Sequence, residues 1–306
     1  MARLDRLGTA REVAQIGSVI GRDFSYRLMR AVAGMEDVVL QESLERLAEA
    51  DILLVQNMPP ESDYRFKHAL ILDAAYENLL RTRRQVLHRR IAEILRDQFA
   101  ARATAEPELL AHHFTQAVLT EAAIEWWGKA GQQSLERSAL MEAIGQITRA
   151  LDQVATLPAT PALRREQIKL QVALISPLIH VRGYAAPETK VATEKAKFLI
   201  EEAEKLGERV EDPLLLFTVL YGFAIANYLR MNGDALRALA AQFLALAQKQ
   251  AEAAPIMIGH RVMGHALLLT GDILKSRAHY DEALKLYNLR PPDLTKFQGL
   301  CAETNS

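Results

Sequence analysis

Residues 271–287 read GDILKSRAHYDEALKLY, and this stretch does most to decide the fold class. Glycine favours the end of one helix and aspartate the start of the next, so the opening Gly-Asp pair predicts a tight turn between two helices. Small and larger apolar residues then recur at helical spacing, which is typical of a helix that packs closely on a neighbour. We therefore expect a helical hairpin over residues 257–290. Its expected contact positions are Gly264, Leu267, Gly271, Ser276, Tyr280 and Ala283.

The same scheme recurs elsewhere in the chain at a length of 34 residues. Residues 124–157 follow it well, residues 219–252 follow it more weakly, and residues 163–206 are degenerate. The matching positions are Trp127, Ala130, Gly131, Ser134, Ala143, Ile147 and Ala150 in the first copy, and Ala226, Leu229, Gly233, Ala238 and Ala245 in the second. This length and spacing resemble the tetratricopeptide repeat, whose helix pairs stack into an α-α solenoid. The alternative is an ordinary helical bundle with small residues placed by chance.

The repeat pattern makes specific structural predictions. From about Pro107 to Leu289 we expect only helices, paired antiparallel. Gly131, Ala143 and Ala150 should lie at helix crossings that are too close for larger side chains. Gly233–Asp234 should form the same turn as the Gly-Asp pair described above, with glycine ending one helix and aspartate capping the next.

Residues 50–70 read ADILLVQNMPPESDYRFKHAL and interrupt the helical pattern. A short apolar run is followed by turn residues with two prolines, which no helix interior tolerates, and then by alternation at Tyr64 and Phe66, so a β-hairpin is predicted. One helix should precede it at residues 39–50, and another should start near Ala69. Their expected inward residues are Leu40, Leu44, Leu47, Ala75, Leu79 and Leu80. This order of elements suggests a winged-helix-like N-terminal module, within a fold that is mainly α.

Composition excludes several classes of protein. Half of the 306 residues are hydrophobic and a quarter are charged, which supports a sizeable core and about two domains. Lysine and arginine number 37 against 38 acidic residues, so the overall charge favours neither a nucleic-acid-coating protein nor an acidic tail. The single cysteine, Cys301, cannot form an internal disulfide. Without a secretory signal or the about 20 apolar residues of a membrane helix, the chain is expected to be cytoplasmic and not membrane-bound.

Catalytic and metal-binding motifs are missing from the sequence. It has no GxxxxGK[ST] phosphate loop, HExxH, CxxC or GxSxG, so we expect a protein that is not an enzyme and has no metal site. His112 and His113 are adjacent and would point about 100° apart on a helix, which prevents them from sharing one ion. His260 and His265 are also poorly spaced for chelation. Satisfied or surface histidines are the favoured interpretation.

Two features remain open to a binding role. Residues 81–90, RTRRQVLHRR, hold five arginines and no acid, and they could contact phosphates or nucleic acid, or form a solvated face paired with acids elsewhere. Leu80, Leu87, Ile91 and Ile94 are expected on the apolar face of this helix. His68 lies where the predicted wing strand enters the next helix, and an imidazole at a helix N-terminus can donate to a phosphate oxygen. The alternative is that His68 caps or packs this corner.

Several runs together resemble a known family: YRFKHALILDAAYENLLRTRRQVLHRRIAEIL, PELLAHHFTQA, AIEWWGKAGQQSLERSA and RGYAAPE. They are similar to the region after the nucleotide-binding module of bacterial STAND-type predicted ATPases, which are often fused to class III adenylate or guanylate cyclase domains. The resemblance extends to about Leu289. In related switch ATPases a winged-helix histidine of a Met-His-Asp motif touches the β-phosphate of ADP. His68 matches this histidine, whereas Lys67 and Ala69 replace its neighbours.

The resemblance implies a domain organisation and a function. Residues 1–100 would form a winged-helix-like lid module, residues 101–290 tetratricopeptide-type repeats, and residues 291–306 an irregular tail. The chain would be a non-catalytic regulatory scaffold that binds a protein or effector on its repeats and contacts a neighbouring P-loop ATPase or cyclase domain, whose ATP or ADP His68 could touch. The alternative is a DNA-binding transcriptional regulator in which the wing and residues 81–90 meet a duplex.

The C-terminal end makes one further prediction. After Tyr287 the sequence NLRPPDLTKFQGLCAETNS has paired prolines and no amphipathic period. The last hairpin should therefore lack the polar capping element that a repeat array needs. We expect exposed leucine and methionine side chains on its outer face, and weak self-association.

Overall fold

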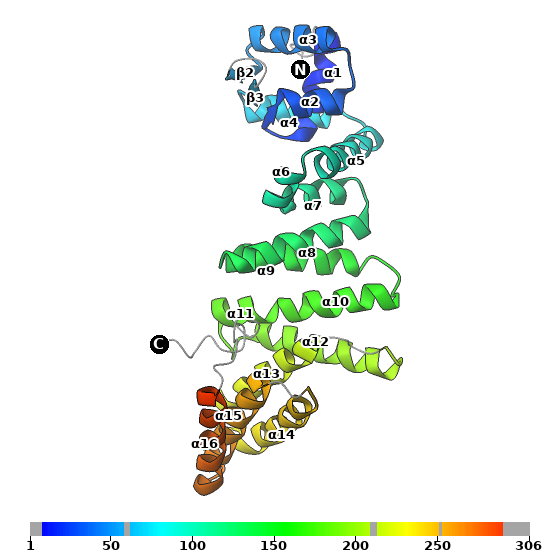
Figure 1. Cartoon of the computed structure of the whole chain (residues 1–306). Helices are drawn as coiled ribbons and strands as arrows, with labels where there is room; N and C mark the ends of the chain where they lie inside the picture. The colour runs from blue at the N-terminus through cyan, green and yellow to red at the C-terminus, as the bar shows by residue number, and fades with distance from the viewer. Residues whose placement is uncertain (1–7, 58–61, 209–212, 251–252, 290–306) are drawn as a thin grey trace. The chain divides into compact units, whose positions relative to one another are not determined.

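The computed structural model describes residues 8–57, 62–208, 213–250 and 253–289, and it confirms that the chain is mainly α-helical (Figure 1). The chain divides into two compact units, residues 1–130 and 131–306. The predicted tail at residues 291–306, with Cys301, lies outside the described residues. The predicted boundary near residue 100, between a winged-helix-like module and the helical repeats, stays a prediction.

The first unit combines helices with a small sheet. Its helices are α1 (Thr9–Ile20), α2 (Tyr26–Ala33), α3 (Asp37–Glu49), α4 (Ala69–Glu77), α5 (Arg81–Gln98), α6 (Ala100–Ala105), α7 (Pro107–Gln116) and the larger part of α8 (Thr120–Glu136). Its strands are β1 (Asp23–Ser25), β2 (Leu53–Gln56) and β3 (Asp63–Phe66).

The predicted β-hairpin is confirmed. Strands β2 and β3 pair antiparallel with Leu53 opposite Phe66, although turn residues 58–61 lie outside the described residues. The sheet has a third strand that the sequence interpretation missed, because β1 pairs antiparallel with the other edge of β3. The Phe24 ring of β1 stacks on Tyr64 at 5.8 Å between ring centroids, so β1 contributes an apolar side chain to the core as well as backbone pairing.

The helices around this sheet bury nearly all the residues expected to point inward. Leu40, Leu44 and Leu47 of α3 are fully buried, and Ala75 and Leu79 are buried as well. The prediction for Leu80 was wrong, because its side chain is 77% exposed. The chain turns between α4 and α5 at this point, and Leu80 is the residue before the first turn of α5, where its carbonyl accepts the amide of Arg84 at 2.9 Å.

The described part of the second unit contains helices and turns without strands. Its helices are α9 (Leu140–Val154), α10 (Pro161–Ala173), α11 (Ile175–Arg182), α12 (Pro187–Lys205), α13 (Pro213–Leu229), α14 (Gly233–Gln250), α15 (Ala253–Leu269) and α16 (Ile273–Leu289). Successive helices from α13 to α16 pack against one another, and aromatic and small side chains from α13, α14 and α15 form their common core. The prediction of helices alone from Pro107 to Leu289 is confirmed for the described residues.

The same turn joins several of the helix pairs. Val118, Ser138, Met231 and Gly271 each have a positive φ, between 56° and 83°. After each of them, the next amide donates to a carbonyl five residues earlier, as in the bond from Leu119 to Phe114 at 3.0 Å. This is the hydrogen-bond pattern of a Schellman motif, which satisfies the last carbonyls of a helix. The recurrence of one turn is the local basis of the repeated helical hairpins.

The Gly-Asp turns were predicted correctly in one case and wrongly in the other. Gly271 has the positive φ, and Asp272 Oδ1 accepts the amide of Lys275 at 3.4 Å, as expected. In the earlier turn Met231 takes the positive φ, and Asn232 Oδ1 accepts the amide of Ala235 at 3.3 Å. Gly233 is instead the first residue of α14, where a Cβ would lie 2.7 Å from Thr270 Cγ2. That glycine is required by packing and not by its backbone conformation.

Replacing Val118 by glycine should raise the free energy of unfolding of the first unit by about 1 kcal/mol, because a β-branched residue is strained at positive φ. Val118 is exposed, so little packing is lost. Urea unfolding of the Val118→Gly variant measures the gain. The converse variant, Gly271→Val, should be destabilised, and a loss of stability in Val118→Gly would contradict the argument.

Small residues occupy several close helix approaches in the second unit. A Cβ on Gly131 would lie 2.5 Å from Ile147 Cγ1, and Ala143 and Ala150 are fully buried, which agrees with the prediction. In the weaker copy the predicted register is wrong. Ala238 and Ala245 are exposed, and the buried small residues lie two positions away, at Ala240 and Ala247.

The last described hairpin exposes leucines, in part as expected. Leu274 and Leu284 of α16 are exposed. Met257, in contrast, is buried, and Met263 packs against the core at partial burial, so the methionine part of the prediction was wrong. Self-association through this face stays a prediction.

Candidate functional site

His68 lies at the position that the sequence predicted. It is the N-cap residue of α4, directly after β3, with an extended backbone. Its side chain is exposed and does not cap the helix, so the interpretation of His68 as a capping residue is wrong. Among the described residues no hydrogen bond or ion pair joins the His68 side chain to another candidate residue. Contact of His68 with a nucleotide phosphate stays a prediction.

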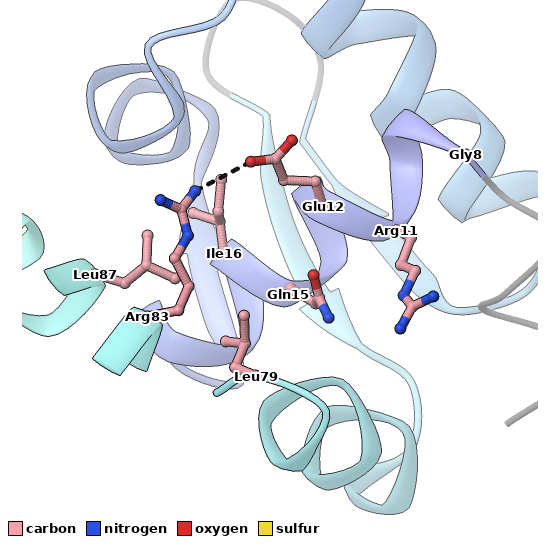
Figure 2. Close-up of a pocket in the computed structure, with 8 residues that line it drawn as sticks. All are labelled: Gly8, Arg11, Glu12, Gln15, Ile16, Leu79, Arg83 and Leu87. Carbon is pink, nitrogen blue, oxygen red and sulfur yellow. Dashed lines mark hydrogen bonds and ion pairs between the residues drawn. The ribbon is translucent and has the colours of Figure 1, made fainter. Parts of the chain in front are cut away.

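The arginines of residues 81–90 do not form one continuous free basic surface. An η nitrogen of Arg83 lies 3.1 Å from Glu12 Oε1 on α1, and Arg89 Nε lies 2.9 Å from Glu93 Oε1. Figure 2 shows the first of these pairs in a pocket of about 280 Å³ between α1 and α5. A carboxylate therefore offsets the charge of Arg83 there, although Arg11 also lines this pocket.

A second pocket of the first unit has a different charge. It encloses about 330 Å³ between α4, α5 and the end of α7. Its lining residues are Tyr76, Arg81, Arg84, Gln85, His88, Thr115, Gln116 and Val118. Two of these lining residues are arginines, and none of them is acidic. The Arg84 guanidinium lies 4.8 Å from the Tyr76 ring centre, and its Nε donates to the Leu79 carbonyl at 2.9 Å.

Two buried histidines contact each other at this pocket, and one of them, His88, lines it. His88 of α5 and His113 of α7 are 2% and 1% exposed, and their Nδ1 atoms are 2.8 Å apart. The other ring nitrogen of His88, Nε2, lies 3.1 Å from the Tyr76 hydroxyl. Nε2 of His113 is buried without a hydrogen-bond partner among the described residues. One pocket-lining tyrosine is thus connected through His88 to a histidine in the interior.

Burial controls the protonation of this pair. It lowers the pKa of His88 from 6.5 to about 4, with smaller contributions from the nearby His112 and Arg84. Burial also lowers the pKa of His113, and His88, His112 and Arg102 add to that effect. Both rings are therefore neutral at pH 7. A single proton between the two Nδ1 atoms can then form the hydrogen bond, with one ring as donor and the other as acceptor.

His112 and His113 were expected to point about 100° apart on their helix, and their rings nevertheless lie near each other. Their centroids are 5.6 Å apart, and His112 also contacts the His88 ring. Within the described ranges, no three His, Cys, Asp or Glu side chains are arranged to hold a metal ion. The contact between His88 and His113 was not foreseen. The available signal was that both histidines fall on apolar helix faces.

The second unit has its own candidate pocket, between α13, α14 and α15. It encloses about 200 Å³ and is lined by Tyr221, Ile225, Tyr228, Leu229, Leu236, Arg261, Val262 and His265. An η nitrogen of Arg261 donates to the Tyr221 hydroxyl at 2.9 Å. The His265 ring contacts the rings of Tyr228 and Tyr280 at 4.9 and 5.5 Å. The pocket therefore combines apolar walls, aromatic rings and one cation.

His260 and His265 form the other histidine pair considered from the sequence. His260 Nδ1 instead lies 3.0 Å from Nδ1 of His279 on α16. Burial is the main cause that lowers the pKa of both His260 and His279.

None of the helices in the described part of the chain has the length and apolar character needed to cross a membrane.

Comparison with known proteins gives limited matches. No protein-family model matches the chain. The uncharacterized protein R02095 of Rhizobium meliloti (strain 1021) is 31% identical over 209 residues, which are 68% of this chain and 20% of that protein. The chain thus spans about a fifth of the length of this relative. No function is attached to the relative's name.

One solved structure is similar over most of the chain. It is a Signal Transduction ATPase with Numerous Domains (STAND) protein with a tetratricopeptide repeat sensor, PH0952 from Pyrococcus horikoshii. The alignment covers 95% of this chain and 46% of that chain, with 13% sequence identity and a TM-score of 0.42. Both the identity and the TM-score are low.

Proposed function

We propose that the chain is a non-catalytic sensor scaffold of a STAND ATPase or nucleotide-cyclase signalling protein. In this proposal tetratricopeptide-type helix pairs bind an effector or protein partner, and the chemistry takes place in other domains. The observation that carries the proposal is the pocket of α13, α14 and α15, because concave sites with apolar walls and a few polar groups are the usual form of a ligand site. The family resemblance of the sequence motifs supports the signalling context.

The lining of this pocket favours an anionic group on an apolar body. Arg261 bonds to a tyrosine hydroxyl, and no carboxylate among the described residues forms an ion pair with it. Its remaining guanidinium donors suit a carboxylate or phosphate oxygen. Ile225, Leu236 and Val262 supply apolar walls. A small effector or the acidic side chain of a partner protein could satisfy both requirements.

The first unit would serve as the lid of the proposed switch. The order of helices, β2–β3 hairpin and following helix supports a winged-helix-like module. His68 is exposed at the start of α4, so a neighbouring P-loop ATPase domain in the cytoplasm could place its bound ATP or ADP against it. No cofactor is proposed for the chain alone.

The proposal can be tested with the long Rhizobium meliloti relative. The parts of that protein outside the matched region are produced separately and mixed with the full chain. We expect a complex in gel filtration and a change in nucleotide turnover, whereas the chain alone should neither hydrolyse ATP nor form cyclic nucleotide. The relative's own matched region is the positive control. If that region binds and this chain does not, the proposal is wrong.

Arg261→Gln tests the role of the pocket in the same experiment. It should weaken the regulatory effect, because it removes the pocket cation, while Arg277→Gln removes an exposed charge of the same unit and should not. Equal effects of the two variants would contradict a specific role of the pocket.

Salt-dependent binding of a DNA duplex, without any effect on nucleotide turnover, would instead favour a transcriptional regulator.

A further inference from the structure

The pocket between α4, α5 and α7 concentrates positive charge in the first unit. Arg81 and Arg84 both line it, and no acidic residue does. Arg83 and Arg89, which do not line it, lie beside glutamates. Arg90, the fifth arginine of residues 81–90, is exposed and does not line the pocket. Two arginine charges of this part of α5 are therefore directed to a concave site.

The start of α5 adds donors to the same place. The helix is 18 residues long, and its N-cap residue Leu80 provides no side-chain cap. Its first turn contains no acidic residue. The backbone amides at a helix start lack partners within the helix, and together with the helix dipole they favour an anion. Arg81 belongs to this first turn and also lines the pocket.

The hydrogen bonds of the buried histidines determine whether the Tyr76 hydroxyl can donate its hydrogen to another group. If His113 Nδ1 donates to His88 Nδ1, then His88 Nε2 carries a hydrogen and donates to the Tyr76 oxygen. The Tyr76 hydroxyl hydrogen is then not used in the bond to His88 and can be donated to another group, and His113 Nε2 is a buried acceptor. The opposite arrangement would leave a buried N–H of His113 unpaired, which is rarer in proteins than an unpaired acceptor. The first arrangement is therefore favoured.

We propose that this pocket binds a phosphate group, either free phosphate or the phosphate of a small metabolite, through Arg81, Arg84 and the Tyr76 hydroxyl. A phosphate dianion matches two guanidinium charges, and its three terminal oxygens can accept from the arginines, the hydroxyl and the helix start. The volume of about 330 Å³ admits a phosphate with a small organic group. His88 and His113 are positioning residues that hold the hydroxyl of Tyr76.

Titration of the full chain with inorganic phosphate, at constant ionic strength and pH 7.5, tests the site by calorimetry. Saturable binding of one phosphate per chain is expected. Arg81→Gln should weaken it about tenfold, which is the effect of one charge-assisted hydrogen bond. Tyr76→Phe removes only a hydroxyl and should weaken binding by a factor of about 5. Arg84→Gln is a less specific test of phosphate binding, because it also removes the hydrogen bond from Arg84 to the Leu79 carbonyl.

The matched control is Arg89→Gln, which removes the same charge from the same helix outside the pocket and should change the Kd less than about twofold. Circular dichroism verifies that each variant is folded. Glycerol 3-phosphate distinguishes the two sources of phosphate, because tighter binding than free phosphate identifies a metabolite and equal binding identifies phosphate itself. The absence of saturable binding, or equal losses in Arg81→Gln and Arg89→Gln, would overturn the proposal, as would preferential binding of a DNA duplex.

Discussion

Replacing Gly264 by leucine should lower the free energy of unfolding of the second unit by about 2 kcal/mol. A Cβ at this position would lie 2.8 to 3.0 Å from three atoms of the Tyr280 ring on α16. The ring has little freedom to withdraw, because it also contacts His265 at 5.5 Å. Overpacking of this kind costs up to about 3 kcal/mol, and the better helix propensity of leucine offsets about 1 kcal/mol.

Hydrogen exchange of the amides in α15 and α16 measures this loss locally. Gly145→Leu is the matched control, because a Cβ on Gly145 of α9 would meet no atom within 4 Å. That variant should be stabilised by up to about 1 kcal/mol, since leucine replaces glycine in an exposed helix. Tyr280→Ala combined with Gly264→Leu should recover part of the loss. If Gly264→Leu leaves exchange unchanged, then α15 and α16 do not approach each other as closely as described.

Local patterns were sufficient to predict most of the fold. The hairpin of β2 and β3, the buried face of α3 and the turn at Gly271 all follow from residue types within a few positions of one another. Strand β1 could not be predicted in this way, because its three residues are ordered by pairing with β3, where Asp23 lies opposite Arg65, 42 positions along the chain. Met231 was missed for a related reason. Its side chain has no preference for a positive φ, so packing of the flanking helices must determine that conformation.

The candidate sites were less predictable than the fold. The sequence singled out His68 and the arginine run, but whether an arginine is paired depends on which acid the tertiary structure places beside it, as Glu12 lies beside Arg83. The contact of His88 with His113 joins residues 25 positions apart on two helices. Only their positions among the apolar residues of α5 and α7 pointed to burial. The pocket around Arg261 likewise needs three helices to be packed before its residues meet.

Lowering the pH from 7.5 to 5 should destabilise the first unit by about 2 to 4 kcal/mol, which is the second large effect that we expect. Unfolding exposes His88 and His113 to water and returns their pKa to about 6.5. In the folded unit, burial holds the pKa of His88 at about 4 and that of His113 well below 6.5. The unfolded chain therefore binds protons in this range that the folded unit does not bind.

Stability is full above pH 6.5 and falls as the pH drops toward 4, with His88 alone contributing about 2 kcal/mol by pH 5. The groups that face the pair from neighbouring elements are Tyr76 of α4, Arg84 of α5, Arg102 of α6 and His112 of α7. Arg84, Arg102 and His112 oppose protonation of the pair. No carboxylate is among the causes of the lowered pKa of His88 or of His113.

Tryptophan fluorescence can follow this effect selectively. The chain has two tryptophans, Trp126 and Trp127, and both lie in the first unit. Trp127 is buried and its indole nitrogen donates to Thr115 Oγ1 of α7 at 3.0 Å, so its emission should change when this unit unfolds. Urea unfolding followed by this emission at pH 5 and at pH 7.5 then gives the pH dependence at the first unit, away from His260 and His279 of the second unit.

Variants separate the buried pair from other titrating groups. In the double variant His88→Leu, His113→Leu the difference in unfolding free energy between pH 5 and 7.5 should shrink to less than about 1 kcal/mol, whatever the absolute stability of the variant. His68→Gln replaces an exposed histidine of the same unit and should keep the full difference. In the unmodified chain, the ring resonances of His88 should not titrate above pH 5, and those of His113 should not titrate near the ordinary histidine pKa of 6.5. If they titrate near pH 6.5 while the unit is folded, the rings are not held neutral by burial, and the directed hydrogen bond from His113 through His88 to Tyr76 loses its basis.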